Sequence, residues 1–85
     1  SMGPVQSIES LLLAYASTSA PHLRQALLCE IEAAQFLLGE GYSLLYHRRK
    51  ICHVEVDLIV TKDGVVTLVE VKTLASFDHL PHRLS

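Results

Sequence analysis

Two largely alternating apolar segments, separated by Asp63 and Gly64, are the feature that most constrains the fold of this chain. Residues 54–61 and 65–73 alternate between apolar and polar side chains over most of their length, which is typical of strands. An Asp-Gly pair between two such segments is among the strongest short-range signals for a β-hairpin. The sequence therefore predicts two antiparallel strands in which Lys62 lies opposite Val65.

This hairpin register decides which side chains share a face of the sheet, because directly opposed residues lie on the same side. One predicted face is apolar and consists of Val56, Leu58, Val60, Val69 and Val71. The other face carries Glu55, Asp57, Glu70 and Lys72 far from the turn, and Ile59, Val66 and Leu68 near it. We expect the apolar part of this second face to be covered, which would leave its charged part at the mouth of a cleft.

The predicted register places Asp57 opposite Glu70, and two opposed carboxylates destabilise a sheet. A divalent cation between them would turn this cost into a binding site, and Mg²⁺ prefers one or two carboxylates together with water and phosphate. Lys72 points the same way and could position or deprotonate a water molecule, or hold a phosphate. The alternative is a solvated face on which Glu55 and Lys72 form a surface ion pair worth less than about 1 kcal/mol.

Two helices are predicted before the hairpin, over residues 7–17 and from Pro21 to about residue 38, followed by a strand over residues 42–50. Glu30 falls within the apolar stripe of the second helix, three residues after Leu27 and four before Ala34. A carboxylate on the packed face of a helix is uncommon unless it is paired or bound to a metal. Glu30 is therefore either a further member of the acidic site or a boundary residue that reaches water.

Composition excludes several classes of protein. Apolar residues make up 49% of the 85 residues, with only four Gly and three Pro, which excludes a disordered or collagen-like chain. Cys29 and Cys52 are far apart, so neither a disulfide-rich secreted domain nor a four-cysteine zinc site is expected. The apolar run over residues 11–16 is much shorter than the roughly 20 residues of a membrane span. We therefore expect a cytoplasmic protein with reduced thiols and no membrane contact.

The order of these residues resembles the PD-(D/E)xK nuclease superfamily. More narrowly, residues 28–73 resemble the YraN-like bacterial family, which is related to archaeal Holliday-junction resolvases. The matching residues are Glu30 to Ala34, Leu37 and Leu38, Gly41 and Tyr42, Glu55 to Val60, and Val69 to Thr73.

The resemblance implies an α/β fold of the restriction-endonuclease type, in which helices pack on a small mixed sheet that contains the antiparallel hairpin. It also implies a metal-dependent nuclease that hydrolyses phosphodiester bonds in DNA, including structured or branched DNA. Asp57, Glu70 and the Val71 carbonyl would hold Mg²⁺ or Mn²⁺, Lys72 would assist the attacking water, and Glu30 would complete the site. The alternative is a non-catalytic oligomerisation or nucleic-acid-binding module that retains the nuclease scaffold.

The basic residues Arg48, Arg49 and Lys50 follow His47 and form the one basic cluster of the sequence. They could contact DNA phosphates or simply form a solvated strand.

We interpret residues 1–18 as an expression remnant followed by a short helix, and residues 19–85 as a nuclease-like core truncated at its C-terminal end. Strands missing from such a core could come from a second copy, through swapping or edge pairing, which predicts a homodimer or larger homo-oligomer.

Overall fold

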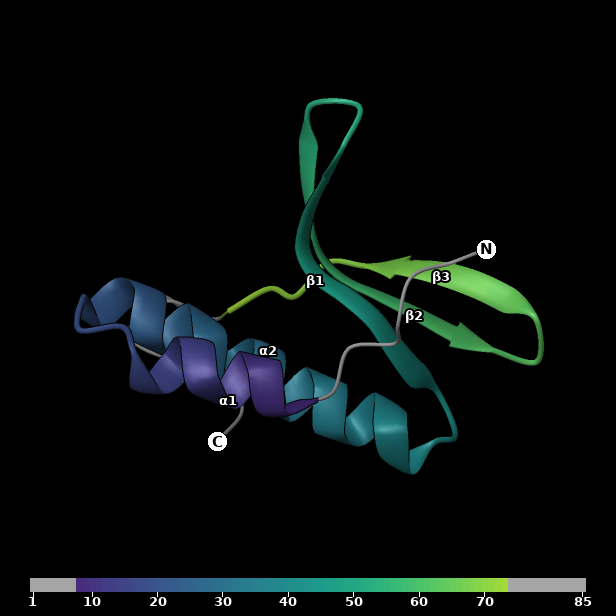
Figure 1. Ribbon diagram of the computed structural model, residues 1–85, viewed down its shortest axis with the longest axis horizontal. Helices are drawn as coiled ribbons and strands as arrows, with labels where there is room; N and C mark the ends of the chain where they lie inside the picture. Colours follow the sequence, from purple (N-terminus) through teal and green to yellow (C-terminus); the bar gives the residue numbers. More distant parts are fainter. Residues whose placement is uncertain (1–7, 74–85) are drawn as a thin grey trace, which may run out of the picture.

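The computed structural model describes residues 8–73, which form two helices and three strands. These are α1 (Ile8–Ala16), α2 (Pro21–Gly39), β1 (Ser43–Ile51), β2 (Val54–Lys62) and β3 (Val65–Val69). The strands form one sheet in the order β1-β2-β3, and both helices lie on the same side of it (Figure 1). The predicted α/β class and order of elements are confirmed. Both strand pairs are antiparallel, so residues 8–73 do not contain the parallel pair of a mixed sheet.

The core lies between the two helices and the sheet, and all five elements contribute apolar side chains to it. Leu11 of α1, Leu27 of α2 and Leu58 of β2 are at most 2% exposed. Ile31, Ala34, Leu44 and Val60 complete the buried cluster, and Val69 of β3 packs against its edge. Because α1 contributes to the same core as α2, the N-terminal helix is part of the domain.

Local sequence accounts for both ends of α2. Ala20 occupies the N-cap without a side-chain hydrogen bond, and Pro21 begins the first turn, where its missing N–H costs nothing. At the other end Gly41 has a φ of +94°, and the Tyr42 amide donates to the Leu37 carbonyl at 3.0 Å. A left-handed residue after a helix favours glycine, so Gly41 accounts for the end of α2 at Gly39.

The β2–β3 hairpin has the predicted register over five residue pairs, from Lys62 opposite Val65 to Leu58 opposite Val69. Asp63 and Gly64 have φ values of +52° and +78°, as a two-residue turn with both central residues in the left-handed region requires. The third strand, however, ends at Val69 and does not continue to residue 73. The predicted pairs of Asp57 with Glu70 and of Glu55 with Lys72 are therefore not formed.

The β1–β2 hairpin extends beyond the body of the molecule (Figure 1). Its strands pair from Ser43 opposite Thr61 to Ile51 opposite Val54, with an irregularity between Leu44 and Tyr46. The sheet thus continues well past the part of it that the helices cover.

The second face of the sheet is only partly as expected. Ile59 is buried, but Val66 and Leu68 of β3 are 52% and 56% exposed, so the predicted cover over them is not found. Within residues 8–73 neither helix is both long and apolar enough to cross a membrane. Residues 74–85, which the sequence interpretation includes in the nuclease-like core, lie outside the described residues.

Replacing Leu58 with alanine should lower the free energy of unfolding by about 3 kcal/mol, because this fully buried side chain would leave a cavity between β2 and the helices. Leu68→Ala, which changes an exposed side chain on the neighbouring strand, should cost less than about 1 kcal/mol. Urea unfolding followed by circular dichroism measures both values. Equal costs for the two variants would contradict this position of the core.

Candidate functional site

An ion pair between a buried glutamate and a half-buried arginine joins α2 to β1. Glu30 is 3% exposed, and its two carboxylate oxygens accept hydrogen bonds from Arg48, from Nε at 3.1 Å and from Nη2 at 2.8 Å. A forked pair of this kind fixes both side chains and is stronger than a bond between neutral groups. The predicted position of Glu30 on the packed face is confirmed. Its charge is matched by Arg48, for which the sequence left a DNA contact and a solvated strand as alternatives.

The backbone at Arg48 makes this pair possible. Arg48 has a φ of +51°, which is uncommon for a residue other than glycine. Strict alternation would send the side chains of His47 and Arg48 to opposite faces of β1. Instead His47 is hydrogen-bonded to Ser10 of α1 at 2.9 Å, while Arg48 reaches Glu30 of α2. Two successive residues therefore contact the helices.

The pKa of Glu30 lies above its ordinary value of 4.5. Burial is the largest cause, because it removes water from the carboxylate, and the negative charges of Asp57 and Glu55 act in the same direction. The hydrogen bond and positive charge of Arg48 oppose this shift. Glu30 therefore lies close enough to Asp57 for the two carboxylates to repel each other.

Asp57 is joined to the segment that follows β3. The backbone N–H of Val71 donates to Asp57 Oδ2 at 2.8 Å, across the position where the sequence predicted a ladder pair. This bond orients the carboxylate and removes the need to place Glu70 directly opposite Asp57. The chain leaves the regular strand at Val69, yet Val71 stays in contact with Asp57 and Lys72 stays close enough to be affected by its charge.

Glu70 and Lys72 form an exposed ion pair in which Nζ lies 2.8 Å from the Glu70 carboxylate. The hydrogen bond from Lys72 lowers the pKa of Glu70, and the same bond raises the pKa of Lys72, with a further contribution from the charge of Asp57. Lys72 is therefore protonated at neutral pH. This favours its use as a hydrogen-bond donor to an anion over its use as a base.

The structure thus brings the predicted site residues together in pairs. Arg48 holds Glu30, Val71 holds Asp57, and Lys72 holds Glu70. Across residues 8–73, no three side chains of His, Cys, Asp or Glu are grouped so that they could hold a metal ion. The donors nevertheless fit Mg²⁺ or Mn²⁺, because both metals prefer oxygen ligands and Mg²⁺ is often held by only two carboxylates.

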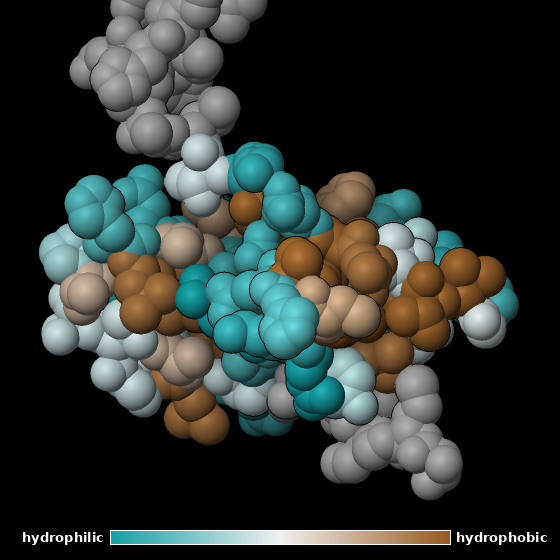
Figure 2. All heavy atoms as spheres, turned by 90° about the horizontal axis from the view of Figure 1, so that it is seen from above, coloured by the Kyte–Doolittle hydropathy of each residue, from teal (hydrophilic) through white to brown (hydrophobic). Residues whose placement is uncertain are grey.

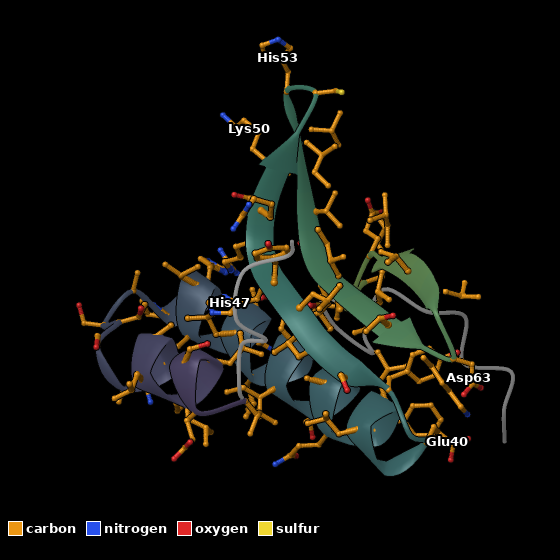
Figure 3. The ribbon with its side chains drawn as sticks, turned by 45° about the vertical axis from the view of Figure 1, so that its right-hand side comes forward. Glu40, His47, Lys50, His53 and Asp63 are labelled. Carbon is orange, nitrogen blue, oxygen red and sulfur yellow. The ribbon has the colours of Figure 1, made fainter. Side chains whose placement is uncertain are left out.

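The remaining basic residues lie on the exposed part of the β1–β2 hairpin. The Arg49 guanidinium stacks on the Tyr46 ring, 3.7 Å from its centroid, and Lys50 is exposed near the hairpin end (Figure 3). The cluster of three basic residues is therefore divided. Arg48 turns toward α2, while Arg49 and Lys50 remain accessible to a partner.

The fold and these paired carboxylates define a small α/β domain with an acidic site beside one hairpin. Residues 29–83 match the family UPF0102, which is described as an uncharacterised protein family, and the chain belongs to this family. No solved structure matches the chain.

Two curated relatives illustrate the extent of the similarity. A UPF0102 protein of Thermus thermophilus is 55% identical over 47 residues, which cover 55% of this chain and 42% of the relative. A UPF0102 protein of Bradyrhizobium sp. strain ORS 278 is 42% identical over 67 residues, which cover 74% of this chain and 48% of the relative. The matched region of this chain therefore spans less than half the length of these relatives.

Replacing Arg48 with alanine should lower the free energy of unfolding at pH 7 by about 3 kcal/mol, because a buried carboxylate would lose its counter-charge. Arg49→Ala, which removes an exposed stacking contact next to it, should cost less than about 1 kcal/mol. Urea unfolding of both variants tests this difference. A loss for Arg48→Ala as small as that for Arg49→Ala would contradict a stabilising ion pair.

The raised pKa of Glu30 predicts the sign of a pH effect. The folded chain binds a proton at Glu30 more readily than the unfolded chain, so the contribution of this group to the free energy of unfolding falls as pH rises above about 4.5. The Glu30→Gln variant lacks this titration. The free energy of unfolding of the wild type minus that of the variant should therefore decrease between about pH 4 and about pH 7. An increase would mean that attraction to Arg48 outweighs burial.

Proposed function

We propose that this chain carries the metal-dependent nuclease core of a restriction-endonuclease-like protein that hydrolyses phosphodiester bonds in DNA. The observation that carries the proposal is the 2.8 Å hydrogen bond from the Val71 amide to Asp57 Oδ2. It connects the acid of β2 to the segment Glu70-Val71-Lys72, which is the combination that the nuclease resemblance requires. The buried Glu30 on α2 supports the same assignment, because it lies close enough to Asp57 for the negative charge of Asp57 to raise its pKa.

In this proposal Asp57, Glu70 and the Val71 carbonyl would hold Mg²⁺ or Mn²⁺. The metal would supply positive charge to the scissile phosphate and would make a water molecule more acidic. The Val71 amide holds Oδ2 of the Asp57 carboxylate, so Oδ1 would be the oxygen offered to the metal. Glu70 must exchange Lys72 for the metal as its partner.

Lys72 would act by donating hydrogen bonds. A lysine ammonium exposed to water is charged at neutral pH without help from Glu70, and release of Glu70 leaves Nζ available to a phosphate oxygen or to the attacking water. Glu30 would act beside the metal position and not as its main ligand, because both of its oxygens are held by Arg48. The protein thus supplies position and charge, which is most of what phosphoryl transfer requires.

A second candidate is a non-catalytic module that retains this scaffold. The observation that favours it is that two of the three carboxylates already have protein cations as partners, Glu30 with Arg48 and Glu70 with Lys72. Exposed Val65, Val66 and Leu68 on the edge strand β3 would fit association with a second copy in such a module. The two candidates differ in how Asp57 responds to metal.

Asp57→Asn should abolish Mn²⁺-dependent cleavage of DNA, because the amide keeps an oxygen for the Val71 N–H but loses the negative charge that a cation needs. The assay uses supercoiled, linear duplex and single-stranded DNA with Mn²⁺ or Mg²⁺, applied to this chain and to a full-length family member. Asp63→Asn, in the turn between β2 and β3, is the matched control and should cleave like the wild type.

Thermal unfolding with and without Mn²⁺ separates the two candidates. A nuclease core should be stabilised by Mn²⁺ only when Asp57 is intact. If Asp57→Asn melts at a higher temperature and Mn²⁺ changes neither protein, the carboxylates merely repel each other, and the non-catalytic module is the correct function.

A further inference from the structure

We propose that the outer half of the β1–β2 hairpin is a two-stranded ribbon that enters the major groove of double-stranded DNA. The ribbon consists of residues 49–56. This inference rests on the proposed function and deepens it, because it names the surface that holds the DNA while Asp57 and Glu70 act on it.

The first support is the position of the ribbon. Its three outermost residue pairs run from Arg49 opposite Val56 to Ile51 opposite Val54, and residues 49–55 are all exposed. Figure 1 shows this part standing clear of both helices and of β3. At about 3.4 Å per residue, three pairs project roughly 10 Å, and the major groove is about 8.5 Å deep.

The second support is charge. The ribbon carries two cations, Arg49 and Lys50, and one carboxylate, Glu55 opposite Lys50, so it is net positive although the whole chain has a net charge of −2. Lys50 and His53 lie near the outer end of the ribbon, whereas His47 lies at its base beside the helices (Figure 3). Cations at an end that projects from an acidic protein are complementary to a phosphate backbone.

The third support is an apolar pair beside these cations. Ile51 and Val54 face each other at the last position of the ladder and are 38% and 61% exposed. Seen from above, the face over the hairpin shows hydrophilic side chains next to hydrophobic ones (Figure 2). In a major groove, apolar side chains contact thymine methyl groups while the neighbouring cations contact phosphates.

The tight turn keeps the ribbon narrow. Cys52 and His53 form a two-residue loop with φ values of +49° and +68°, a conformation that usually selects Asn or Gly. The hairpin therefore closes without a wide loop. A two-stranded ribbon fits the roughly 12 Å major groove of B-form DNA, but not its roughly 6 Å minor groove. It does not fit the deep and narrow major groove of an RNA duplex either, so DNA is the partner that the shape selects.

The test measures binding of a fluorescein-labelled DNA duplex by fluorescence anisotropy, in EDTA and with a reducing agent, so that neither metal nor cleavage contributes. Lys50→Gln should weaken binding about threefold or more and lower the salt dependence, because one phosphate contact is lost. Gln35→Glu on α2 changes the net charge by the same amount at an exposed position and should leave binding unchanged.

The apolar pair has its own matched control. Val54→Ser should weaken binding severalfold without changing the salt dependence, because it removes a contact to bases and not to phosphates. Leu13→Ser removes a comparably exposed apolar side chain from α1, 68% against 61%, and should have no effect. Circular dichroism melting establishes that each variant is folded.

A fluorescent label on Cys52 gives a readout that needs no variant of the binding surface. In a Cys29→Ser background, a solvent-sensitive dye on Cys52 should change its emission when duplex DNA is added. The same dye on a Gln35→Cys variant that lacks both native cysteines should not respond.

Three outcomes would contradict the proposed role of the ribbon in binding DNA. The first is that the duplex does not bind in EDTA, and the second is that Lys50→Gln and Val54→Ser bind it like the wild type. The third is that double-stranded RNA binds as tightly as DNA. These outcomes are distinct from failure of the nuclease. DNA binding that depends on the hairpin, without Mn²⁺-dependent cleavage, would support the ribbon proposal and contradict the nuclease proposal. Cleavage that needs Asp57 but is unchanged in the ribbon variants would support the nuclease proposal and contradict the ribbon proposal.

Discussion

A carboxylate inside a core of leucine, isoleucine and valine is the constraint around which the rest of this structure is arranged. Glu30 cannot remain charged in that position without a partner, since burial of an isolated charge costs several kcal/mol. Arg48 supplies the partner, and to reach Glu30 it takes a left-handed backbone conformation inside a strand. That conformation breaks the alternation of β1 and divides the basic cluster into an inner and an outer part.

Much of the fold could be predicted from the sequence, because it follows from local chemistry. Asp63 and Gly64 specify a tight turn, and the turn specifies the register of β2 and β3 down to Leu58 opposite Val69. Pro21 and Gly41 mark the ends of α2 for equally local reasons. The position of Glu30 on the packed face follows from helical periodicity alone.

The rest could not be predicted, because it depends on contacts between distant residues. Extending the β2–β3 register past Val69 would bring Asp57 opposite Glu70. In the structure the Val71 amide takes that place, and no pattern in the sequence distinguishes a ladder bond from a bond to a side chain. The choice of Arg48 over Arg49 as the partner of Glu30 likewise depends on one backbone angle, and both arginines look alike in a strand. The sequence therefore predicted which residues matter near the acidic site better than which residues they contact.

The contact of Lys62 with the end of α2 has a mechanical consequence. Its ammonium group donates to the Glu40 carbonyl at 2.7 Å, so the corner between α2 and β1 is tied to the inner end of β2, near the turn at Asp63 (Figure 3). The β1–β2 hairpin is thus held at its inner end and has no contact with the helices at its outer end (Figure 1). Arg48 is the last residue of β1 that is bonded to a helix, and the exposed part of the hairpin begins directly after it. A load on the outer end is therefore borne first by the pair of Arg48 with Glu30, which lies next to the acidic site.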